Sequence, residues 1–179
     1  MLLMPKRDWQ WGYNETYGVL SVSLGDDMEF LSPYKLKSLI PDAKETMEFS
    51  VEHAKFYIDL VDRLSKTLSL NDALIVQIAL NATVAHFLLK PQMPKSWFFK
   101  TSNQCVYSEV GKLFQLTTSE HTVLAMVIES GLQASLVMIM STECRLTDSK
   151  SLKQFETIKV MHDRLAPLSV QTQQQFHAA

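Results

Sequence analysis

The sequence predicts an α+β protein, in which an N-terminal α/β domain (an antiparallel meander with two main helices) precedes a small C-terminal β-barrel domain. Three observations support this class. Short alternating segments open the chain, two helical periods occupy its middle, and β-branched and apolar segments recur in its second half. The expected parts are residues 1–90 for the first domain, 91–97 for a proline-rich strap, 98–170 for the second domain and 171–179 for a flexible tail.

The meander is expected over residues 8–31. In its first strand Trp9, Trp11 and Tyr13 alternate with other residues, which is the period of a half-buried strand. A run of glycine and aspartate then predicts a tight turn between the next two strands, because these residues tolerate turn conformations. The two further strands are expected over residues 19–24 and 28–31, with the turn at residues 25–27.

Two helices are expected after the meander. Residues 51–66 place apolar side chains on one face, as in an amphipathic surface helix, and Ser50 is suited to cap the first turn. A second helix over residues 70–89 is apolar nearly all round. Ser69 and Asp72 resemble a capping box at its start. Polar residues along this helix favour a buried core element over a membrane span, since each would lose water in lipid.

Helical periodicity weakens after the strap, and short strand candidates follow one another. Ser130 and Gly131 predict a turn between the two most apolar candidates. Residues 157–168 fit either a helix or a strand, and we favour a strand that enters the barrel. The remaining strand candidates are residues 106–107, 113–116, 121–129, 134–140 and 143–146.

The composition is that of an ordinary globular protein, with 46% hydrophobic and 20% charged residues. A formal net charge of −2 provides no broad basic field for general nucleic-acid binding, although residues 91–179 carry a net charge of +1 against −3 for residues 1–90. Cys105 and Cys144 are too few for a disulfide framework and are expected as reduced thiols in the β-rich core. The short apolar start does not resemble a signal peptide, so we expect a cytoplasmic protein.

Motifs for catalysis and cofactor binding are missing from the sequence. None of the five glycines are clustered, so there is no phosphate-binding loop and no dinucleotide fingerprint. The five histidines contain no i, i+4 pair that would place two metal ligands on one helix face, and there is no CxxC motif. We therefore expect a protein without enzymatic activity, bound metal or cofactor.

The most distinctive segment is residues 90–97, which combines two prolines, two lysines, a methionine and a tryptophan. Pro91 and Pro94 hold their own φ near −65° and bias the preceding residues toward extended conformations. The strap should therefore be stiff and exposed, and it is a plausible contact surface.

Two interpretations of the strap remain open. In the first it is a linker, in which Met93 and Trp97 pack between the two domains. In the second it is a binding edge, in which Lys90 and Lys95 make charged contacts beside an apolar patch. Together with Lys100, the same lysines and tryptophan also form a weak version of a nucleic-acid-binding pattern, which is kept as an alternative.

Four motifs occur in order over nearly the whole chain, and the strap is the most specific of them. They are Trp9-x-Trp11, residues 80–82 leading to 89–97, residues 127–131, and residues 158–167. In these motifs the sequence resembles the ZapC family of bacterial cell-division proteins. His162, Ala166 and Phe98 depart from the family pattern, and the alanine removes a positive charge that many members carry.

The resemblance implies a non-enzymatic protein that binds FtsZ, the tubulin-like GTPase of the mid-cell division ring, and promotes lateral bundling of its filaments. It also implies an α/β domain and a β-barrel domain, each with a pocket. The implied FtsZ contacts are Lys90 and Lys95 in the strap, Val22 beside the N-terminal pocket, and Lys159 and Arg164 in the last motif.

Bundling requires contact with two filament subunits at once, and two unlike domains favour a monomer with two contact surfaces. No membrane or nucleic-acid partner is expected. Within the strap, Pro91 and Pro94 are expected to provide stiffness, while Met93 and Trp97 are expected to hold the domains in the geometry that presents the lysines.

Overall fold

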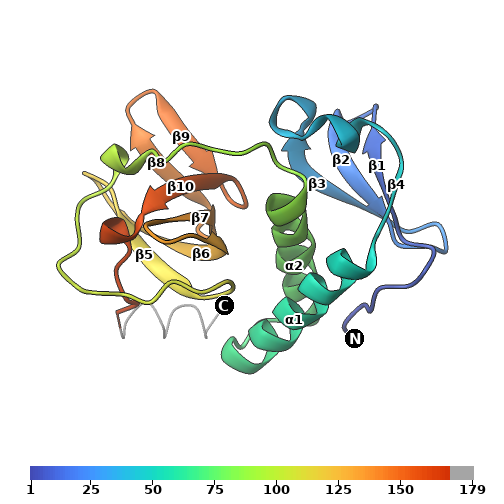
Figure 1. Cartoon of the computed structure of the whole chain (residues 1–179), viewed down its shortest axis with the longest axis horizontal. Helices are drawn as coiled ribbons and strands as arrows, with labels where there is room; N and C mark the ends of the chain where they lie inside the picture. The colour runs from blue at the N-terminus through green and yellow to red at the C-terminus, as the bar shows by residue number, and fades with distance from the viewer. Residues whose placement is uncertain (170–179) are drawn as a thin grey trace. The chain divides into compact units, whose positions relative to one another are not determined.

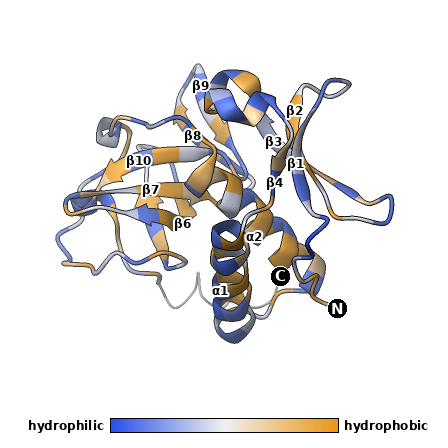
Figure 2. Cartoon of the chain, turned by 45° about the vertical axis from the view of Figure 1, so that its right-hand side comes forward, coloured by the Kyte–Doolittle hydropathy of each residue, from blue (hydrophilic) through white to orange (hydrophobic). Residues whose placement is uncertain are grey.

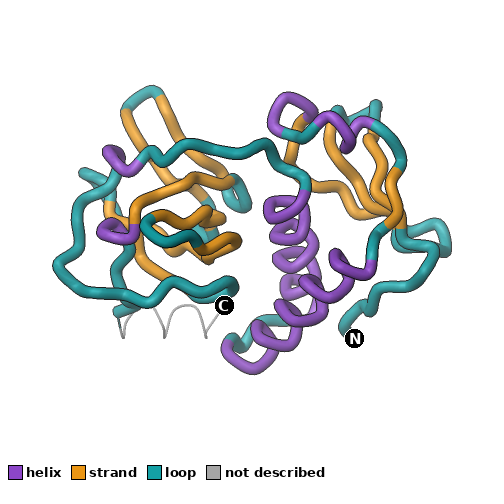
Figure 3. The backbone as a smooth tube through the Cα atoms, in the orientation of Figure 1, coloured by secondary structure: helices purple, strands orange, loops and turns teal. Residues whose placement is uncertain are grey.

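In the computed structural model, which describes residues 1–169, the chain divides into two units between Lys90 and Pro91. The first unit contains a sheet and two long helices, α1 (Val51–Thr67) and α2 (Asp72–Phe87) (Figure 1). The second is built of strands joined by loops and short 3-10 turns (Figure 3). The predicted order of an α/β part and a β-rich part is confirmed, and the tail expected at 171–179 lies outside the described residues.

The sheet of the N-terminal unit is an antiparallel meander with the strand order β3-β2-β1-β4. Gly25, Asp26 and Asp27 all have positive φ in the turn between β2 and β3, which explains why glycine and aspartate stand there. The third strand continues beyond the predicted end, and the very short fourth strand has no sequence signal. The strands are β1 (Gln10–Asn14), β2 (Val19–Ser23), β3 (Glu29–Lys35) and β4 (Met47–Glu48).

Aromatic side chains join this sheet to α1. Trp9 and Trp11 are each only 1% exposed, and their ring centroids lie 5.3 Å and 5.1 Å from that of Phe49. Trp9 also makes an edge-to-face contact with Tyr57 of α1, at 5.8 Å. Such pairs stabilise a core beyond the burial of their area, by about 0.5–1.5 kcal/mol each. The alternation of tryptophans in the sequence therefore reports the buried face of the sheet.

The amphipathic helix α1 begins where the sequence predicts. The Ser50 hydroxyl accepts a hydrogen bond from the His53 backbone N–H at 3.2 Å, and the Ser50 N–H donates to His53 Nδ1 at 3.1 Å. This reciprocal pair satisfies two N–H groups at the helix start. Apolar and polar residues alternate along α1, whereas α2 is apolar along most of its length (Figure 2).

Helix α2 is a core element, and its residues from Ile78 to Ala85 are all buried. Its cap is Asn71, whose Oδ1 accepts from the Leu74 N–H at 2.8 Å. The predicted capping box of Ser69 and Asp72 is therefore wrong, because the helix begins two residues later than the apolar pattern suggests. Within the described residues no helix has the length and apolar character that crossing a membrane requires.

The C-terminal unit contains a four-stranded antiparallel sheet with the order β10-β7-β6-β5, and a separate hairpin of β8 and β9. The ambiguous segment 157–168 is a strand only as far as Met161 and then turns through the 3-10 helix η4 (His162–Arg164). The candidate at 106–107 forms no strand. The strands are β5 (Leu113–Thr117), β6 (Thr122–Ser130), β7 (Ala134–Ile139), β8 (Glu143–Thr147), β9 (Lys150–Lys153) and β10 (Thr157–Met161).

Closure of these strands into a barrel is not found in the described part of the chain. After β10 the chain turns at η4 and contacts β5 through an isolated bridge between Gln115 and Ala166 and a hydrogen bond from Gln115 Nε2 to the Ser169 hydroxyl. The hairpin of β8 and β9 does not extend the sheet. The sheet therefore stays open, although its core is continuous: Phe114, Val137 and Val160 are each at most 1% exposed.

The two cysteines differ in environment. Cys144 of β8 is fully buried within this core, as expected, whereas Cys105 is exposed in the loop before β5. The prediction of two core thiols is therefore wrong for Cys105, which lies in a loop directly before residues 106–107, where a strand was expected. Burial, and secondarily the Glu143 carboxylate, raises the pKa of Cys144 to about 11, so that its thiol stays protonated at neutral pH.

The cap of α2 can be tested by comparing Asn71→Ala with Ser69→Ala. We expect Asn71→Ala to lower the free energy of unfolding by about 1 kcal/mol, because the Leu74 N–H loses its partner. Ser69→Ala should change it by less than about 0.5 kcal/mol. Urea denaturation followed by far-ultraviolet circular dichroism measures both, and equal losses would contradict the cap at Asn71.

The pH dependence of stability provides a second test. His53 Nδ1 accepts from both the Ser50 N–H and Trp11 Nε1–H, the latter at 3.0 Å, so a proton on this nitrogen would break both hydrogen bonds. Burial, opposed by the nearby Glu52 carboxylate, lowers the pKa of His53 from its ordinary value of 6.5. The folded protein thus resists a proton that the unfolded chain accepts.

The stabilisation that neutral His53 provides is fully present above pH 6.5, the pKa of histidine in the unfolded chain. It is lost as the pH falls below this value. We expect the wild type to lose up to about 1.4 kcal/mol of unfolding free energy per pH unit more than His53→Gln in this range. Urea denaturation on either side of this value measures the difference. Parallel pH profiles for the two proteins would show that His53 is not the group responsible.

Candidate partner-binding strap

Lys90 is positioned by the end of α2. The chain after this helix pairs with the segment between β3 and β4, through the bridge Leu39–Leu89 and a hydrogen bond from the Lys90 N–H to the Ser38 carbonyl at 2.9 Å. Lys90 Nζ donates to the Lys37 carbonyl, also at 2.9 Å. The Lys90 side chain is exposed. Its ammonium therefore stands at the surface of the N-terminal unit, beside the backbone of a second lysine.

The strap, residues 91–97, belongs to the C-terminal unit, where it lies along β10. The Lys95 N–H donates to the Lys159 carbonyl at 2.8 Å, and the Met161 N–H donates to the Ser96 hydroxyl at 2.7 Å. Gln92 Nε2 donates to the Thr157 hydroxyl at 2.7 Å. These three bonds fasten the strap to both ends and the middle of the strand, so the predicted stiffness has a physical basis beyond the two prolines.

The strap has four exposed residues, which are Pro91, Met93, Lys95 and Trp97. Lys95 is exposed, Met93 is 79% exposed and Trp97 is 69% exposed. Between them Ser96 is 7% exposed, and Phe99 just beyond the strap is 3% exposed. The packing role predicted for Met93 and Trp97 stays a prediction, but the described residues leave both side chains largely uncovered.

The other predicted contact residues have more restricted surroundings. Val22 of β2 is fully buried in the N-terminal core, so a partner does not reach its side chain in this conformation. Lys159 of β10 is half-buried. The Arg164 side chain is 24% exposed: its Nη1 donates to the Phe99 carbonyl at 2.9 Å and its Nε lies 3.2 Å from Asp163. Arg164 thus holds the chain after the strap.

A polar chain inside the C-terminal unit had no signal in the sequence. The Ser135 hydroxyl, on β7, lies 2.6 Å from the Ser108 hydroxyl and 2.8 Å from His162 Nε2. A serine beside a histidine suggests nucleophilic chemistry, but Ser135 is fully buried and no substrate can reach it. These hydrogen bonds instead connect β7 to η4 and to the loop before β5. The bonded side chains are 27 residues apart, which no local pattern reveals.

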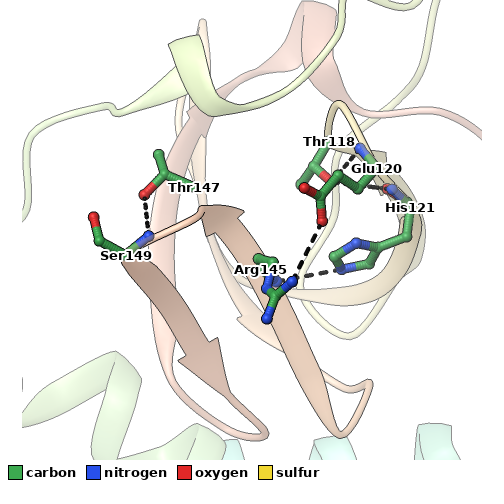
Figure 4. Close-up of polar contacts among 6 residues, drawn as sticks. All are labelled: Thr118, Glu120, His121, Arg145, Thr147 and Ser149. Atoms are coloured by element: carbon green, nitrogen blue, oxygen red, sulfur yellow. Dashed lines mark hydrogen bonds and ion pairs between the residues drawn. The ribbon is translucent and has the colours of Figure 1, made fainter.

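A second polar cluster fastens the hairpin of β8 and β9 to the turn between β5 and β6 (Figure 4). The Arg145 N–H donates to His121 Nε2 at 3.2 Å, and Arg145 Nη1 lies 3.8 Å from Glu120. The Thr118 hydroxyl accepts from the Glu120 and His121 N–H groups, which shapes the turn. Each of these contacts has a structural role, and the cluster contains no arrangement of a nucleophile with a base.

An open pocket of about 310 Å³ lies between the loop before β5 and the chain after η4. Its cation is Lys112, whose Nζ donates to the Tyr107 carbonyl at 3.0 Å and lies 5.3 Å from the centre of the Phe114 ring. Neither Lys159 nor Arg164 lines it. Nowhere in residues 1–169 do three or more His, Cys, Asp or Glu side chains gather as a potential metal site.

Comparisons with known proteins give a consistent result. The family descriptions "Cell-division protein ZapC, N-terminal" and "Cell-division protein ZapC, C-terminal" match residues 2–90 and 91–171. Cell division protein ZapC of Shewanella woodyi is 68% identical over 95% of this chain and 94% of its own length. The namesake proteins of Shewanella oneidensis and Ferrimonas balearica are 63% and 44% identical, over 96% and 93% of this chain and 97% and 93% of their own lengths.

The two family matches meet between Lys90 and Pro91, where the structure also divides into its two units. The similarity to the relatives extends through both units and includes the strap. The chain therefore belongs to the ZapC family of cell-division proteins and has a role in cell division.

Proposed function

We propose that this protein binds filaments of FtsZ at the division ring and bundles them laterally, without catalysing a reaction. The observation that carries the proposal is the strap, which presents Lys95 on a rigid backing directly after the exposed Lys90. Family membership supplies the cell-division context. The strap is also the most specific of the four motifs in which the sequence resembles the family.

The charge around the strap suits an acidic partner. The sequence contains no aspartate or glutamate between Asp72 and Glu109, a stretch that includes Lys90, Lys95 and Lys100. Long lysine side chains on a surface attract acidic partners and accelerate their encounter, although each exposed contact contributes little to affinity. The same lysines provide too small a basic field for general nucleic-acid binding.

Bundling follows if one molecule makes two filament contacts. Lys90 belongs to the N-terminal unit, and Lys95 and Lys159 belong to the C-terminal unit, so both units offer cations. When the first contact forms, the second becomes intramolecular, and its effective concentration rises. Two weak contacts on a monomer are therefore sufficient, and no dimer is required.

The roles of Lys90 and Lys95 can be tested by charge reversal. Lys90→Asp combined with Lys95→Asp should weaken co-sedimentation with GTP-assembled FtsZ filaments at least about tenfold, because it replaces attraction by repulsion. Wild-type binding should also weaken with salt, since exposed charges are screened within about 8 Å at physiological ionic strength. Light scattering reports bundling on the same samples.

The matched control is Lys44→Asp with Lys153→Asp, which changes the net charge equally at two exposed lysines outside the strap. It should leave co-sedimentation close to that of the wild type. Equal losses in both double variants would show a general charge effect, and full binding by the strap variant would leave the strap only a connecting role.

The two-contact proposal predicts a monomer in solution. In sedimentation equilibrium at micromolar concentration, the protein should fit the mass of a single chain, 20.4 kDa. Bundling by a monomer then requires two sites in one chain. A tight dimer of twice that mass would overturn the proposal in favour of one site used twice.

A further inference from the structure

The side chains of the strap point alternately inward and outward, as in a strand that lies along the edge of β10. Gln92 and Ser96 turn inward, where their side chains bond Thr157 and the backbone of Met161. The intervening Met93 and Lys95 are exposed. With Trp97, these outward residues form a row that we call the outer row, defined as Met93, Lys95 and Trp97.

The outer row is held in place before any partner arrives. The bond from the Lys95 N–H to the Lys159 carbonyl lies in its middle, and the short 3-10 helix η3 (Ser96–Phe98) closes with a bond from the Phe99 N–H to the Ser96 carbonyl. Pro91 and Pro94 restrict the backbone further. A partner that bound the outer row would thus not need to order the backbone, which lowers the cost of association.

Trp97 differs from the other tryptophans of the chain. Trp9 and Trp11 are each 1% exposed, whereas Trp97 is 69% exposed. The centroid of its ring lies 5.5 Å from that of the Phe98 ring, and Met93 adds a flexible apolar side chain in the same strap. Tryptophan and methionine are enriched in protein interfaces, and tryptophan is one of the residues that most often dominates their binding energy.

Cations frame these apolar groups. Lys95 stands between Met93 and Trp97 in the outer row, and Lys150 Nζ lies 5.8 Å from the centre of the Phe98 ring. The outer row is therefore complementary to a protein surface that offers an apolar hollow bordered by carboxylates. A purely charged surface would leave both apolar side chains in water.

We infer that Met93 and Trp97 are the apolar anchors of the filament contact, and that Lys95 is the charged member beside them. The inference rests on the proposed function, because the occupant to which it commits is the surface of an FtsZ filament. It gives Met93 and Trp97 a binding role in place of the packing role expected from the sequence.

The experiment is co-sedimentation of the full-length chain with GTP-assembled FtsZ filaments. Trp97→Ala should weaken binding about tenfold or more, and Met93→Ala by a smaller factor, because truncation of a central aromatic anchor costs most. The matched controls are Tyr17→Ala and Met28→Ala, at side chains that are 68% and 49% exposed in the N-terminal unit. Neither control should change binding.

A packing role would be visible in stability. If Trp97 is an anchor, Trp97→Ala should leave the thermal midpoint within a few degrees of the wild type, as expected for a surface substitution. If the variant instead unfolds at a clearly lower temperature, the tryptophan fluorescence of the wild-type protein provides the test. Trp97 is the accessible tryptophan, so acrylamide quenching measured against Trp97→Phe isolates its signal. Protection of this signal by filaments supports the inference, and unchanged quenching overturns it.

The outcomes separate the two proposals. If the wild type does not pellet with filaments, the proposed function fails. If the wild type pellets, and the Trp97→Ala and Met93→Ala variants pellet equally well, the proposed function stands. The inference that Met93 and Trp97 are apolar anchors is then wrong. Losses of the same size in Tyr17→Ala would also overturn the inference, because they would show that any exposed aromatic residue has this effect.

Discussion

The hydrogen bond between the Lys95 N–H and the Lys159 carbonyl is the contact on which the candidate site depends. A proline-rich segment cannot form a full strand ladder, because each proline lacks an N–H. The strap therefore uses one backbone bond, together with the side chains of Gln92 and Ser96, to hold the edge of β10. This arrangement covers part of an edge that would otherwise invite pairing with another chain. It also fixes which side chains face solvent.

The division of the chain between Lys90 and Pro91 gives Lys90 and Lys95 different supports. Lys90 is held by carbonyl groups of Lys37 and Ser38, next to the C-terminal end of α2, where positive charge is favourable. Lys95 is held by β10. Two cations five positions apart in the sequence thus belong to different units of the structure. One short sequence motif thus places a cation on each of the two units.

The sequence predicts the parts whose signals are local and periodic. Alternating Trp9 and Trp11 indicate a strand with one buried face, and Ser50 indicates a helix cap; both are found. Features that depend on distant residues are missed. The contact of Ser135 with His162 joins separate elements, and barrel closure depends on how the chain turns after Met161. The direction of the strap side chains is likewise hidden, because it is set by partners on β10 about 65 residues away.

Charge alone is a weak basis for the proposed contact. Exposed lysines are well hydrated and screened by salt, and a surface ion pair contributes about 0–1 kcal/mol. Lys90 and Lys95 can therefore steer a partner and set its orientation, but they need an apolar contribution to hold it. In our proposal Met93 and Trp97, which are both exposed, provide that contribution. In the proposed bundling role each contact can be weak and reversible, because the second contact of a bound molecule forms at a raised effective concentration.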